Sequence, residues 1–337
     1  MLSSTASPAR PRRRMVTFSA VLSSVILVVA GCVGTDDAPD SDGGTGAAGT
    51  PELTVAMITH EVPGDTFWEV VRRGADEAAR KNGVDLQYSS DPEAPNQANL
   101  VQEAIDGDVD GIALTLAKPD AMAPVVQRAL DAGVPVVAFN SGFDNWQDIG
   151  VAQYFGQDEM LAGRAAGERL IRDGRTNVLC VIHEQRQVAL ESRCAGVREG
   201  FTRGGFETLD VNSKDMASVV ATLTAKLRQD QSVDSVVTLG APIAQAAVES
   251  RDAAGSTAEI VTFDTNAALI DLIRGGDVRW AVDQQPYVQG HEAVDALWLT
   301  LTNASTVGGG QAVLTGPAWV DRSNVDEVAE YVRDGTR

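Results

Sequence analysis

The stretch VDGIALTLAKPDAMAPVVQRALDAGVPVVAFNSG, residues 109–142, contains one complete structural unit. Its apolar run at 111–116 predicts a buried strand, the amphipathic run at 120–133 predicts a helix that ends at a glycine, and the apolar run at 134–140 predicts a second strand. A helix between two buried strands predicts a right-handed parallel βαβ unit, because the crossover returns the second strand in the direction of the first.

The same alternation recurs from residue 53 to residue 284. Further strands are expected at 53–58, 84–89, 177–184, 235–240, 259–264 and 279–284, and further helices at 66–82, 95–106, 188–203, 216–230, 242–254 and 266–275. Most of the strands are continuous apolar runs, which is typical of sheets that are covered on both faces. Two series of similar rhythm, separated by residues 156–174, predict an α/β fold of two doubly wound parallel-sheet lobes.

Length, charge and missing motifs narrow the function. A chain of 337 residues with 44% hydrophobic content suits two domains with a sizeable core. Its net charge of −20 argues against a nucleic-acid partner, because phosphates require a basic face. The sequence has no H-E-x-x-H, G-x-S-x-G or P-loop motif, so we expect no enzyme activity, no cofactor and no metal.

Residues 1–31 predict a lipoprotein signal peptide. Four arginines precede the apolar run 15–30, as in secretory signals. The run ends in VAGC, residues 29–32, which resembles the lipobox of bacterial lipoproteins and implies lipidation of Cys32. A plain transmembrane anchor is the alternative, although the run is short for a membrane span. Residues 32–51 would then be the anchored cysteine and a flexible linker, since this segment has nothing large and apolar to bury.

Polar residues follow the expected strands, at the edge where sheets of this kind bind their ligands. They include His60, Asp65, Lys118, Asn140, Ser141, His183, Glu184, Asp264 and Gln284. Two aromatic residues, Phe67 and Trp68, come after the first strand. Amides and carboxylates pair with hydroxyl groups, and an aromatic face stacks on the apolar face of a sugar ring. The pattern therefore favours a sugar or polyol as the ligand.

The order and spacing of several segments resemble type I periplasmic solute-binding proteins, in particular the ribose-binding-like sugar branch of ABC importers. The resemblance covers residues 52–337 and is carried by TFWEVVRRGADEAARKNGVDL, VDGIALTLAKPDAMAPVVQRALDAGVPVVAFNSG, FGQDEMLAGRAAGERL, RCAGVREGF, IVTFD and VDQQPYVQG. It implies two lobes that are joined by a three-strand hinge and close on the ligand. The implied boundaries are 52–157 plus 285–312 for lobe 1 and 158–284 plus 313–337 for lobe 2.

Paired aromatic residues after the first strand stack on the sugar in that family, and Phe67 and Trp68 occupy those places. Thr66 is expected to cap the following helix, with Glu69 completing a capping box. Such a cap would direct both rings into the cleft. The alternative is that Phe67 packs in the core, on a hydrophobic stripe with the two valines that follow it in the helix.

Two ligand-binding positions of the family differ in this chain. Sugar binders often have Asp-Arg after the fourth strand, whereas this chain has Asn140 and Ser141, so the charge is lost. Ribose-type members have an asparagine where this chain has Gly240, or Ala241 if the alignment slips by one residue. The resemblance implies that other groups orient the ligand and that the glycine leaves room for a bulkier one. The alternative for Asn140 is a turn-forming role.

Three further positions match the family. Arg193 matches its cleft arginine, Asp264 its hydroxyl-pairing carboxylate and Gln284 its crossover glutamine. The alternatives are a solvated helix arginine for Arg193 and a helix N-cap for Asp264. Asp158 matches a family aspartate near the second crossover, where a structural role is also open.

Cys180 and Cys194 remain as a pair once Cys32 is lipidated. An even pair in an extracytoplasmic chain favours a disulfide, and a cysteine in a strand can reach one in the next helix. Two free buried thiols are the alternative. A zinc site with His183 is disfavoured, because the spacing is not a standard one.

The expected function is that of an extracytoplasmic receptor, attached to the membrane only through its lipid, that delivers a sugar or polyol to the permease of an ABC transporter. We expect it to act as a monomer. Two alternatives stay open. The same fold could hand a sugar or autoinducer signal to a sensor kinase, or the chain could be a secreted enzyme of unrecognised type.

Overall fold

The computed structural model describes residues 52–337. The expected signal peptide, the lipidation site Cys32 and the linker up to residue 51 lie outside the described residues. Within the described part, no helix combines the length and the apolar composition that crossing a membrane requires.

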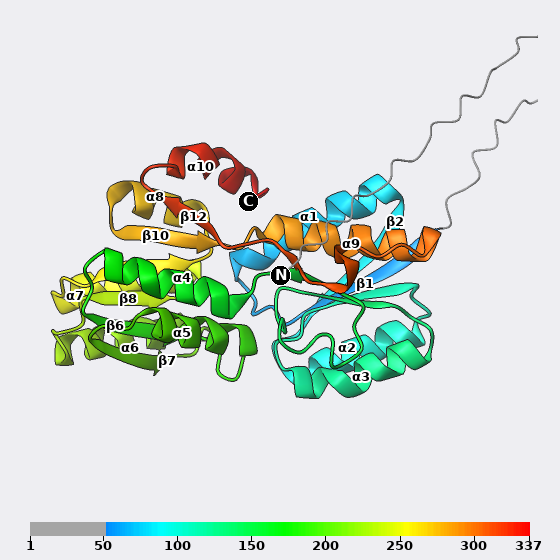
Figure 1. The fold of residues 1–337 in the computed structure, drawn as a ribbon, viewed down its shortest axis with the longest axis horizontal. Helices are drawn as coiled ribbons and strands as arrows, with labels where there is room; N and C mark the ends of the chain where they lie inside the picture. Colours follow the sequence, from blue (N-terminus) through cyan, green and yellow to red (C-terminus); the bar gives the residue numbers. More distant parts are fainter. Residues whose placement is uncertain (1–51) are drawn as a thin grey trace, which may run out of the picture. The chain divides into compact units, whose positions relative to one another are not determined.

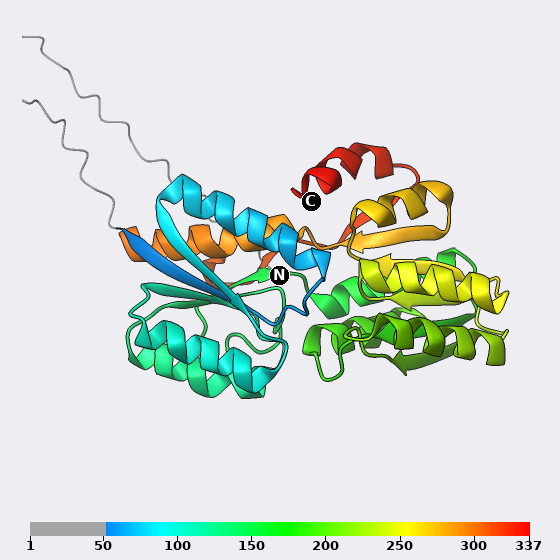
Figure 2. The same ribbon diagram turned by 180° about the vertical axis from the view of Figure 1, so that it is seen from behind.

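Lobe 1 is built on a six-stranded sheet with the order β11-β5-β4-β3-β1-β2 (Figure 1). Its strands, all paired in parallel, are β1 (Leu53–Thr59), β2 (Val84–Ser90), β3 (Gly111–Leu114), β4 (Val136–Phe139), β5 (Gln153–Gly156) and β11 (Val313–Leu314). The covering elements are α1 (Thr66–Asn82) and α9 (Pro286–Asn303) on one face, α2 (Ala94–Asp106) and α3 (Pro119–Asp131) on the other, and a short 3-10 helix (Gly308–Gly310) before β11. Figures 1 and 2 show the two helix pairs on opposite sides of the sheet.

Lobe 2 is built on a second six-stranded sheet, with the order β12-β10-β9-β8-β6-β7. Its strands are β6 (Asn177–Ile182), β7 (Gly205–Asp210), β8 (Ser235–Thr238), β9 (Glu259–Phe263), β10 (Val278–Asp283) and β12 (Ala318–Asp321). All neighbours pair in parallel except β10 and β12, which are antiparallel. The helices are α4 (Glu159–Arg172) and α5 (Val188–Gly200) on one face, and α6 (Met216–Gln229), α7 (Ala241–Ala254), α8 (Ala267–Gly275) and α10 (Val325–Asp334) on the other.

The expected α/β fold of two parallel-sheet lobes is confirmed. Every residue of β3, β4 and β8 is buried, which explains why their sequences show no alternation of polar and apolar residues. The chain crosses between the sheets after β5, after β10 and after β11. The sequence pattern misses β5, β7, β11 and β12, because these strands are short or lie at a sheet edge. The edge strand β7, for example, is mostly exposed and carries no continuous apolar run.

The third crossing lies later than the sequence predicts. Strand β11 pairs with β5, so residues 313 and 314 belong to the sheet of lobe 1. The expected second segment of lobe 2, 313–337, therefore starts too early, and the chain reaches lobe 2 only at β12. A strand of two residues has no hydrophobic period of its own, so only its pairing partner reveals it.

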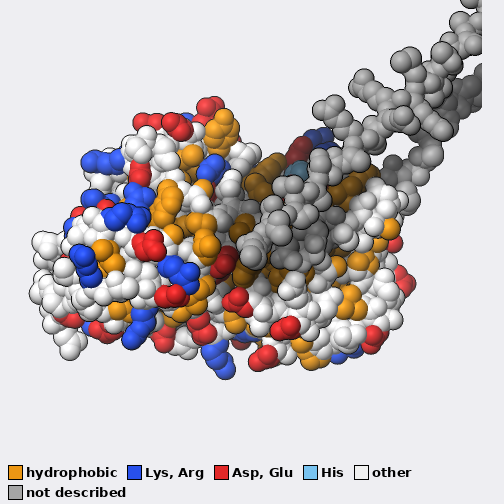
Figure 3. Space-filling view, viewed as in Figure 1, with side chains coloured by type: hydrophobic (Ala, Val, Ile, Leu, Met, Phe, Trp, Pro, Cys, Tyr) orange, Lys and Arg blue, Asp and Glu red, His pale blue; other side chains and the backbone are white. Residues whose placement is uncertain are grey.

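Basic and acidic side chains are interspersed on the face of lobe 2 that Figure 3 shows. In this lobe Arg169 pairs with Asp321 at 2.6 Å, and Arg279 pairs with Asp173 at 3.1 Å. Interspersed charges leave no broad basic face in that view, and a basic face is what nucleic-acid phosphates require.

Helices α1 and α9 approach closely because glycines lie at their contact. A Cβ atom built on Gly74 would lie 2.0 Å from the carbonyl oxygen of Tyr287, and one built on Gly290 would lie 2.0 Å from that of Val71. Helices α4 and α5 meet in the same way, through glycines of both helices. This packing matters for the site, because α1 carries the two predicted aromatic residues and α5 carries Arg193.

Gly74→Ala is expected to lower the free energy of unfolding by about 3 kcal/mol or more, because the added methyl group forces two backbones apart. Urea denaturation measures the change. The control is Gly275→Ala at the end of α8, where the new Cβ would lie 3.3 Å from a carboxylate oxygen at the end of the half-exposed Asp277 side chain. That change should stay within about 0.5 kcal/mol. Equal stability of the two variants would contradict the helix contact described here.

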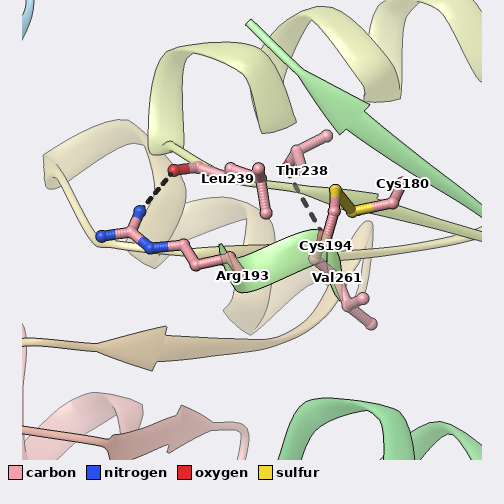
Figure 4. The surroundings of a disulfide bond; sticks show 6 residues. All are labelled: Cys180, Arg193, Cys194, Thr238, Leu239 and Val261. Atoms are coloured by element: carbon pink, nitrogen blue, oxygen red, sulfur yellow. Dashed lines mark hydrogen bonds between the residues drawn. A yellow bond between two sulfur atoms is a disulfide. The ribbon is translucent and has the colours of Figure 1, made fainter. Parts of the chain in front are cut away.

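Cys180 of β6 and Cys194 of α5 form a disulfide in the structure, with Cα atoms 6.0 Å apart (Figure 4). Both residues are buried in the core between α5 and the sheet. The bond lies one residue from Arg193, whose guanidinium donates a hydrogen bond to the carbonyl oxygen of Leu239 at 3.0 Å. The disulfide therefore holds the Arg193 segment of α5 against β6.

Replacing both cysteines by alanine is expected to lower the free energy of unfolding by about 3 kcal/mol, the loop-entropy term for this sequence separation of 14. Urea denaturation with and without reductant tests this. In the protein from residue 33 onward, unfolded without reductant, a thiol assay should find no free thiol. Two reactive thiols, and the same stability in both conditions, would instead favour two free cysteines.

Candidate ligand-binding site

A pocket lies between the two lobes, at the carboxyl ends of their strands. Its cavity volume is about 140 Å³. Lobe 1 contributes residues that follow β1 and β4, lobe 2 contributes residues that follow β6, β8 and β9, and Gln284 comes from the second crossing. Ligands bind at this edge in doubly wound parallel sheets. Residues Thr50–Arg337 form one compact unit, so the pocket lies within a single folded unit.

The structure brings all but one of the predicted ligand-binding residues together around this pocket. The lining includes Phe67, Trp68, Asn140, Arg193, Gly240, Ala241, Asp264 and Gln284. Ser141 is not part of it, because its side chain is fully buried and its hydroxyl oxygen has no hydrogen-bond partner among residues 52–337. Its backbone N–H donates to the carbonyl oxygen of Phe139 at 2.7 Å. Ser141 therefore turns the chain behind Asn140 and presents no group to the cavity.

Phe67 and Trp68 lie in the first turn of α1 and belong to both the core and the pocket. Their side chains are 9% and 4% exposed, and their rings meet edge to face at 5.1 Å. The ring of Trp68 also meets that of His60 edge to face, at 4.8 Å. Core packing of Phe67 and a place in the pocket wall are thus compatible, since its hydrophobic cluster, which includes Val71, borders the cavity.

The cap of α1 is Asp65, not Thr66. The Asp65 carboxylate accepts a hydrogen bond from the N–H of Phe67 at 3.0 Å, and Thr66 is the first helical residue. Burial raises the pKa of Asp65 to about 6. The expected capping box of Thr66 with Glu69 is therefore wrong by one residue. Asp and Thr are both favoured as N-caps, so the sequence offered two adjacent candidates for this position.

Amide side chains connect the lobes through the second crossing. Asn140 donates from Nδ2 to the Oε1 atoms of Gln284, at 3.3 Å, and Gln289, at 3.2 Å. Gln284 in turn donates from Nε2 to Oδ1 of Asp264 at 2.8 Å. Asn140 has a φ of 63°, a left-handed conformation that asparagine tolerates, so it also forms the turn that the alternative interpretation expects.

Arg193 is a buried ion-pair partner and not a solvated helix residue. Its side chain is 3% exposed. Nε and Nη2 donate to the two carboxylate oxygens of Glu159 at 2.6 and 2.8 Å. Nη1 donates to the carbonyl oxygen of Leu239 and also lies 3.7 Å from Oδ2 of Asp264. The bidentate pair fixes the plane of the guanidinium, which keeps further N–H donors for the cavity that it lines.

Asp264 lies beside Arg193 and does not cap α8. That cap is Asn266, whose Oδ1 accepts a hydrogen bond from the N–H of Leu269 at 2.9 Å. Burial raises the pKa of Asp264 to about 7, although the charge of Arg193 opposes the shift. Asp158 is the N-cap of α4, a structural role.

Asp264→Asn should change how the free energy of unfolding depends on pH. The carboxyl titrates near 3.8 in the unfolded chain but holds its proton up to about 7 in the fold. Between these values the folded state binds more protons than the unfolded state, so the contribution of this group to stability falls as pH rises. Urea denaturation without ligand should therefore show wild type losing stability relative to Asp264→Asn from about pH 4 to about pH 7. A difference that is independent of pH would contradict the assignment.

Position after a strand placed His60, Asp65, His183 and Glu184 at the binding edge without assigning them a role, and all four line the pocket. Two further residues near the pocket were not predicted. Gln187 and Glu159 carry no such signal. Gln187 is the N-cap of α5, and Glu159 is an acidic residue in the first turn of α4, a common place for one.

Direct contacts between the lobes border the pocket. Nε2 of Gln187 in lobe 2 lies 3.2 Å from Nε2 of His60 in lobe 1, and the N–H of Val188 donates to the carbonyl oxygen of Ala117 at 3.1 Å. Burial lowers the pKa of His60 to about 3, so its neutral ring accepts the hydrogen bond from the amide of Gln187. The structure is therefore a closed state of the two lobes.

The lining combines aromatic walls with amides, carboxyl groups, neutral imidazoles and one guanidinium. Residues 52–337 contain no group of His, Cys, Asp and Glu side chains arranged to hold a metal ion. A lining of this kind suits a small molecule with several hydroxyls, because each hydroxyl both donates and accepts. Two parallel-sheet lobes, joined by crossings and closed around one pocket, define a two-lobed solute-binding protein.

The chain belongs to the periplasmic binding protein family, because a family model described as a periplasmic binding protein domain matches residues 55–305. A solved structure of a carbohydrate transporter from Acidothermus cellulolyticus, in complex with myo-inositol, is 53% identical in sequence. It covers 85% of this chain and 100% of its own, with a TM-score of 0.84.

Two curated proteins are more distant relatives. The D-ribose/D-allose-binding protein of Pseudomonas aeruginosa is 24% identical, over 70% of this chain and 79% of its own. The xylitol-binding protein of Mycolicibacterium smegmatis is also 24% identical, over 91% of this chain and 87% of its own. The resemblance to type I periplasmic sugar-binding proteins is therefore confirmed, and these relatives are named as binding proteins and not as enzymes.

Proposed function

We propose that this protein is an extracytoplasmic, lipid-anchored solute-binding protein that captures a cyclic polyol and delivers it to the permease of an ABC transporter. Myo-inositol is the first candidate for the ligand. The lining of the pocket suits a ring of hydroxyls, and the chain is 53% identical to a structure that holds myo-inositol. The proposal depends above all on this agreement.

The charges of the pocket favour a neutral ligand over an anionic one. Among the described residues of the lining, Arg193 is the only Lys or Arg, and it already pairs with Glu159 and lies near Asp264. Asp65 and Glu184 add further carboxyl groups to the lining. A phosphorylated polyol would bring negative charge toward these groups with no unpaired cation to receive it, so the site discriminates against it.

The two kinds of side chain in the pocket would contact different parts of the ligand. The rings of Phe67 and Trp68 would contact the apolar face of a polyol ring. Asn140, Asp264 and Gln284 already form a hydrogen-bonded series and would exchange part of it for ligand hydroxyls. Because these groups come from both lobes and from a crossing, a bound ligand bridges the lobes and shifts the population toward the closed state.

The lipid anchor and the transport role are supported by sequence and by relatives. The apolar run that ends in VAGC at residues 29–32 supports lipidation of Cys32 outside the membrane. The 53% identical structure is described as a carbohydrate transporter. A sensing role would use the same pocket and differ only in the partner that receives the closed form.

A thermal-shift panel on the protein from residue 33 onward tests the proposal. Myo-inositol should raise the melting temperature increasingly with its concentration, because a ligand that binds only the folded state stabilises it by mass action. A myo-inositol phosphate should give no shift. A response to D-ribose or xylitol alone would replace myo-inositol as the proposed ligand by that compound. A response to none of these compounds would contradict the proposal.

A further inference from the structure

His183, the residue after β6, lines the pocket with an imidazole that has no partner. No hydrogen bond to either ring nitrogen occurs within residues 52–337, and Nδ1 is fully buried whereas Nε2 is not. Gly240 lies next to the ring. A Cβ built on Gly240 would lie 3.4 Å from Cε1 and 3.7 Å from Nε2 of His183, and apart from the two chain neighbours of Gly240 no other described residue has an atom within 4 Å.

The other imidazole of the pocket, His60, provides a contrast. Its Nδ1 lies 2.7 Å from Oγ1 of Thr115, and its Nε2 lies 3.2 Å from Nε2 of Gln187. Both nitrogens of His60 are therefore occupied by the protein, and this ring serves the closed arrangement of the lobes. His183 has no such internal role, and its polar edge remains for a ligand.

The buried nitrogen determines which tautomer His183 adopts. Burial, assisted by the charge of Arg193, lowers the pKa of His183 to about 4, so the ring is neutral and carries one proton. A buried N–H without an acceptor is rarer in proteins than an unsatisfied acceptor, which places the proton on Nε2 and leaves Nδ1 bare. Nε2–H is then a donor beside the open space at Gly240.

We propose that His183 is a specificity-determining residue that donates a hydrogen bond from Nε2 to one hydroxyl of the ligand, in the space that the glycine at position 240 leaves free. The inference rests on the proposed function, because it assigns this bond within the site for a polyhydroxy ring. A side chain at position 240 would occupy that space from α7, whereas the imidazole enters it from β6. A donor that depends on one hydroxyl rejects an analogue that lacks this group.

Titration calorimetry with myo-inositol on the protein from residue 33 onward, which keeps the compact unit Thr50–Arg337, tests the bond. His183→Phe keeps a ring but removes the donor, and should weaken binding about tenfold. The matched control is His291→Phe on α9, outside the lining, which should leave the dissociation constant unchanged.

Gly240→Ala provides a second, coupled variant. Its methyl group would contact Cε1 of His183 at 3.4 Å and fill the space proposed for the ligand hydroxyl, so it should weaken binding in the wild-type background. In a His183→Ala background the same change should have a smaller effect, because contacting residues are not additive. An equal effect in both backgrounds would count against the pairing of these two positions.

Nitrogen NMR of the imidazoles gives a readout that does not require the variants to fold. The chain has three histidines, so His183 can be assigned against His60 and His291. We expect the Nε2–H tautomer at His183, and a shift of its Nε2 resonance when myo-inositol is added, with His291 unchanged. If wild type binds myo-inositol but neither this resonance nor the affinity of His183→Phe changes, the inference fails and the proposed function stands. If wild type binds no polyol, both fail.

Discussion

Glu159→Gln should lower the free energy of unfolding by about 3 kcal/mol or more and weaken ligand binding. The substitution leaves the guanidinium of Arg193 buried without the carboxylate that now receives two of its hydrogen bonds. Glu159 is itself 3% exposed, so water cannot replace the lost charge. Binding should suffer because the guanidinium lines the pocket and would no longer be held in one plane. Urea denaturation and titration calorimetry measure the two effects separately.

A surface ion pair of the same helix pair supplies the control. Arg164 of α4 and Glu199 of α5 lie 2.8 Å apart, and both side chains are about half exposed. Glu199→Gln should therefore change the free energy of unfolding by at most about 1 kcal/mol and leave affinity unchanged. Equal effects of the two glutamate substitutions would contradict a special role for the buried pair.

Trp68→Ala should weaken ligand binding by about 2 kcal/mol or more, as expected for a buried aromatic anchor. It should also lower the free energy of unfolding by about 3 kcal/mol or more, because Trp68 is part of the core of lobe 1. Titration calorimetry must therefore be done at a temperature at which denaturation curves show the variant fully folded.

Trp146→Ala separates the two effects. Trp146 is as buried as Trp68 but packs on the opposite face of the sheet, outside the pocket lining. It should lose comparable stability and keep wild-type affinity. If both tryptophan variants lose affinity equally, the loss at Trp68 reflects general loosening of lobe 1. Trp68 would then no longer be assigned as a ligand-contacting residue.

Local patterns sufficed to predict the layered fold and the pocket edge. The buried strands are apolar because both faces of each sheet are covered, and the helix predicted at 66–82 has those same bounds in the structure. The rule that ligands bind after the carboxyl ends of strands located Asn140 and Asp264, which the structure brings to one pocket. Arg193 came from the family resemblance, since spacing alone could not distinguish it from a solvated helix arginine.

What the sequence could not supply are relations between distant segments. Glu159 stands 34 positions before Arg193, and nothing near it in the chain indicates a buried partner. The contact of His60 with Gln187 joins residues 127 positions apart, across the two lobes. The pairing that assigns β11 to lobe 1 is of the same kind. Each depends on tertiary packing, which neither hydrophobic period nor capping preference encodes.

Titration calorimetry of myo-inositol into the wild-type protein from residue 33 onward is the decisive experiment for the proposed ligand. We expect one saturable site per chain and a negative heat-capacity change, because the ligand covers apolar surface at Phe67 and Trp68. No heat of binding with myo-inositol, together with none for D-ribose or xylitol at millimolar concentration, would contradict the claim that the pocket between the lobes captures a polyhydroxy ring.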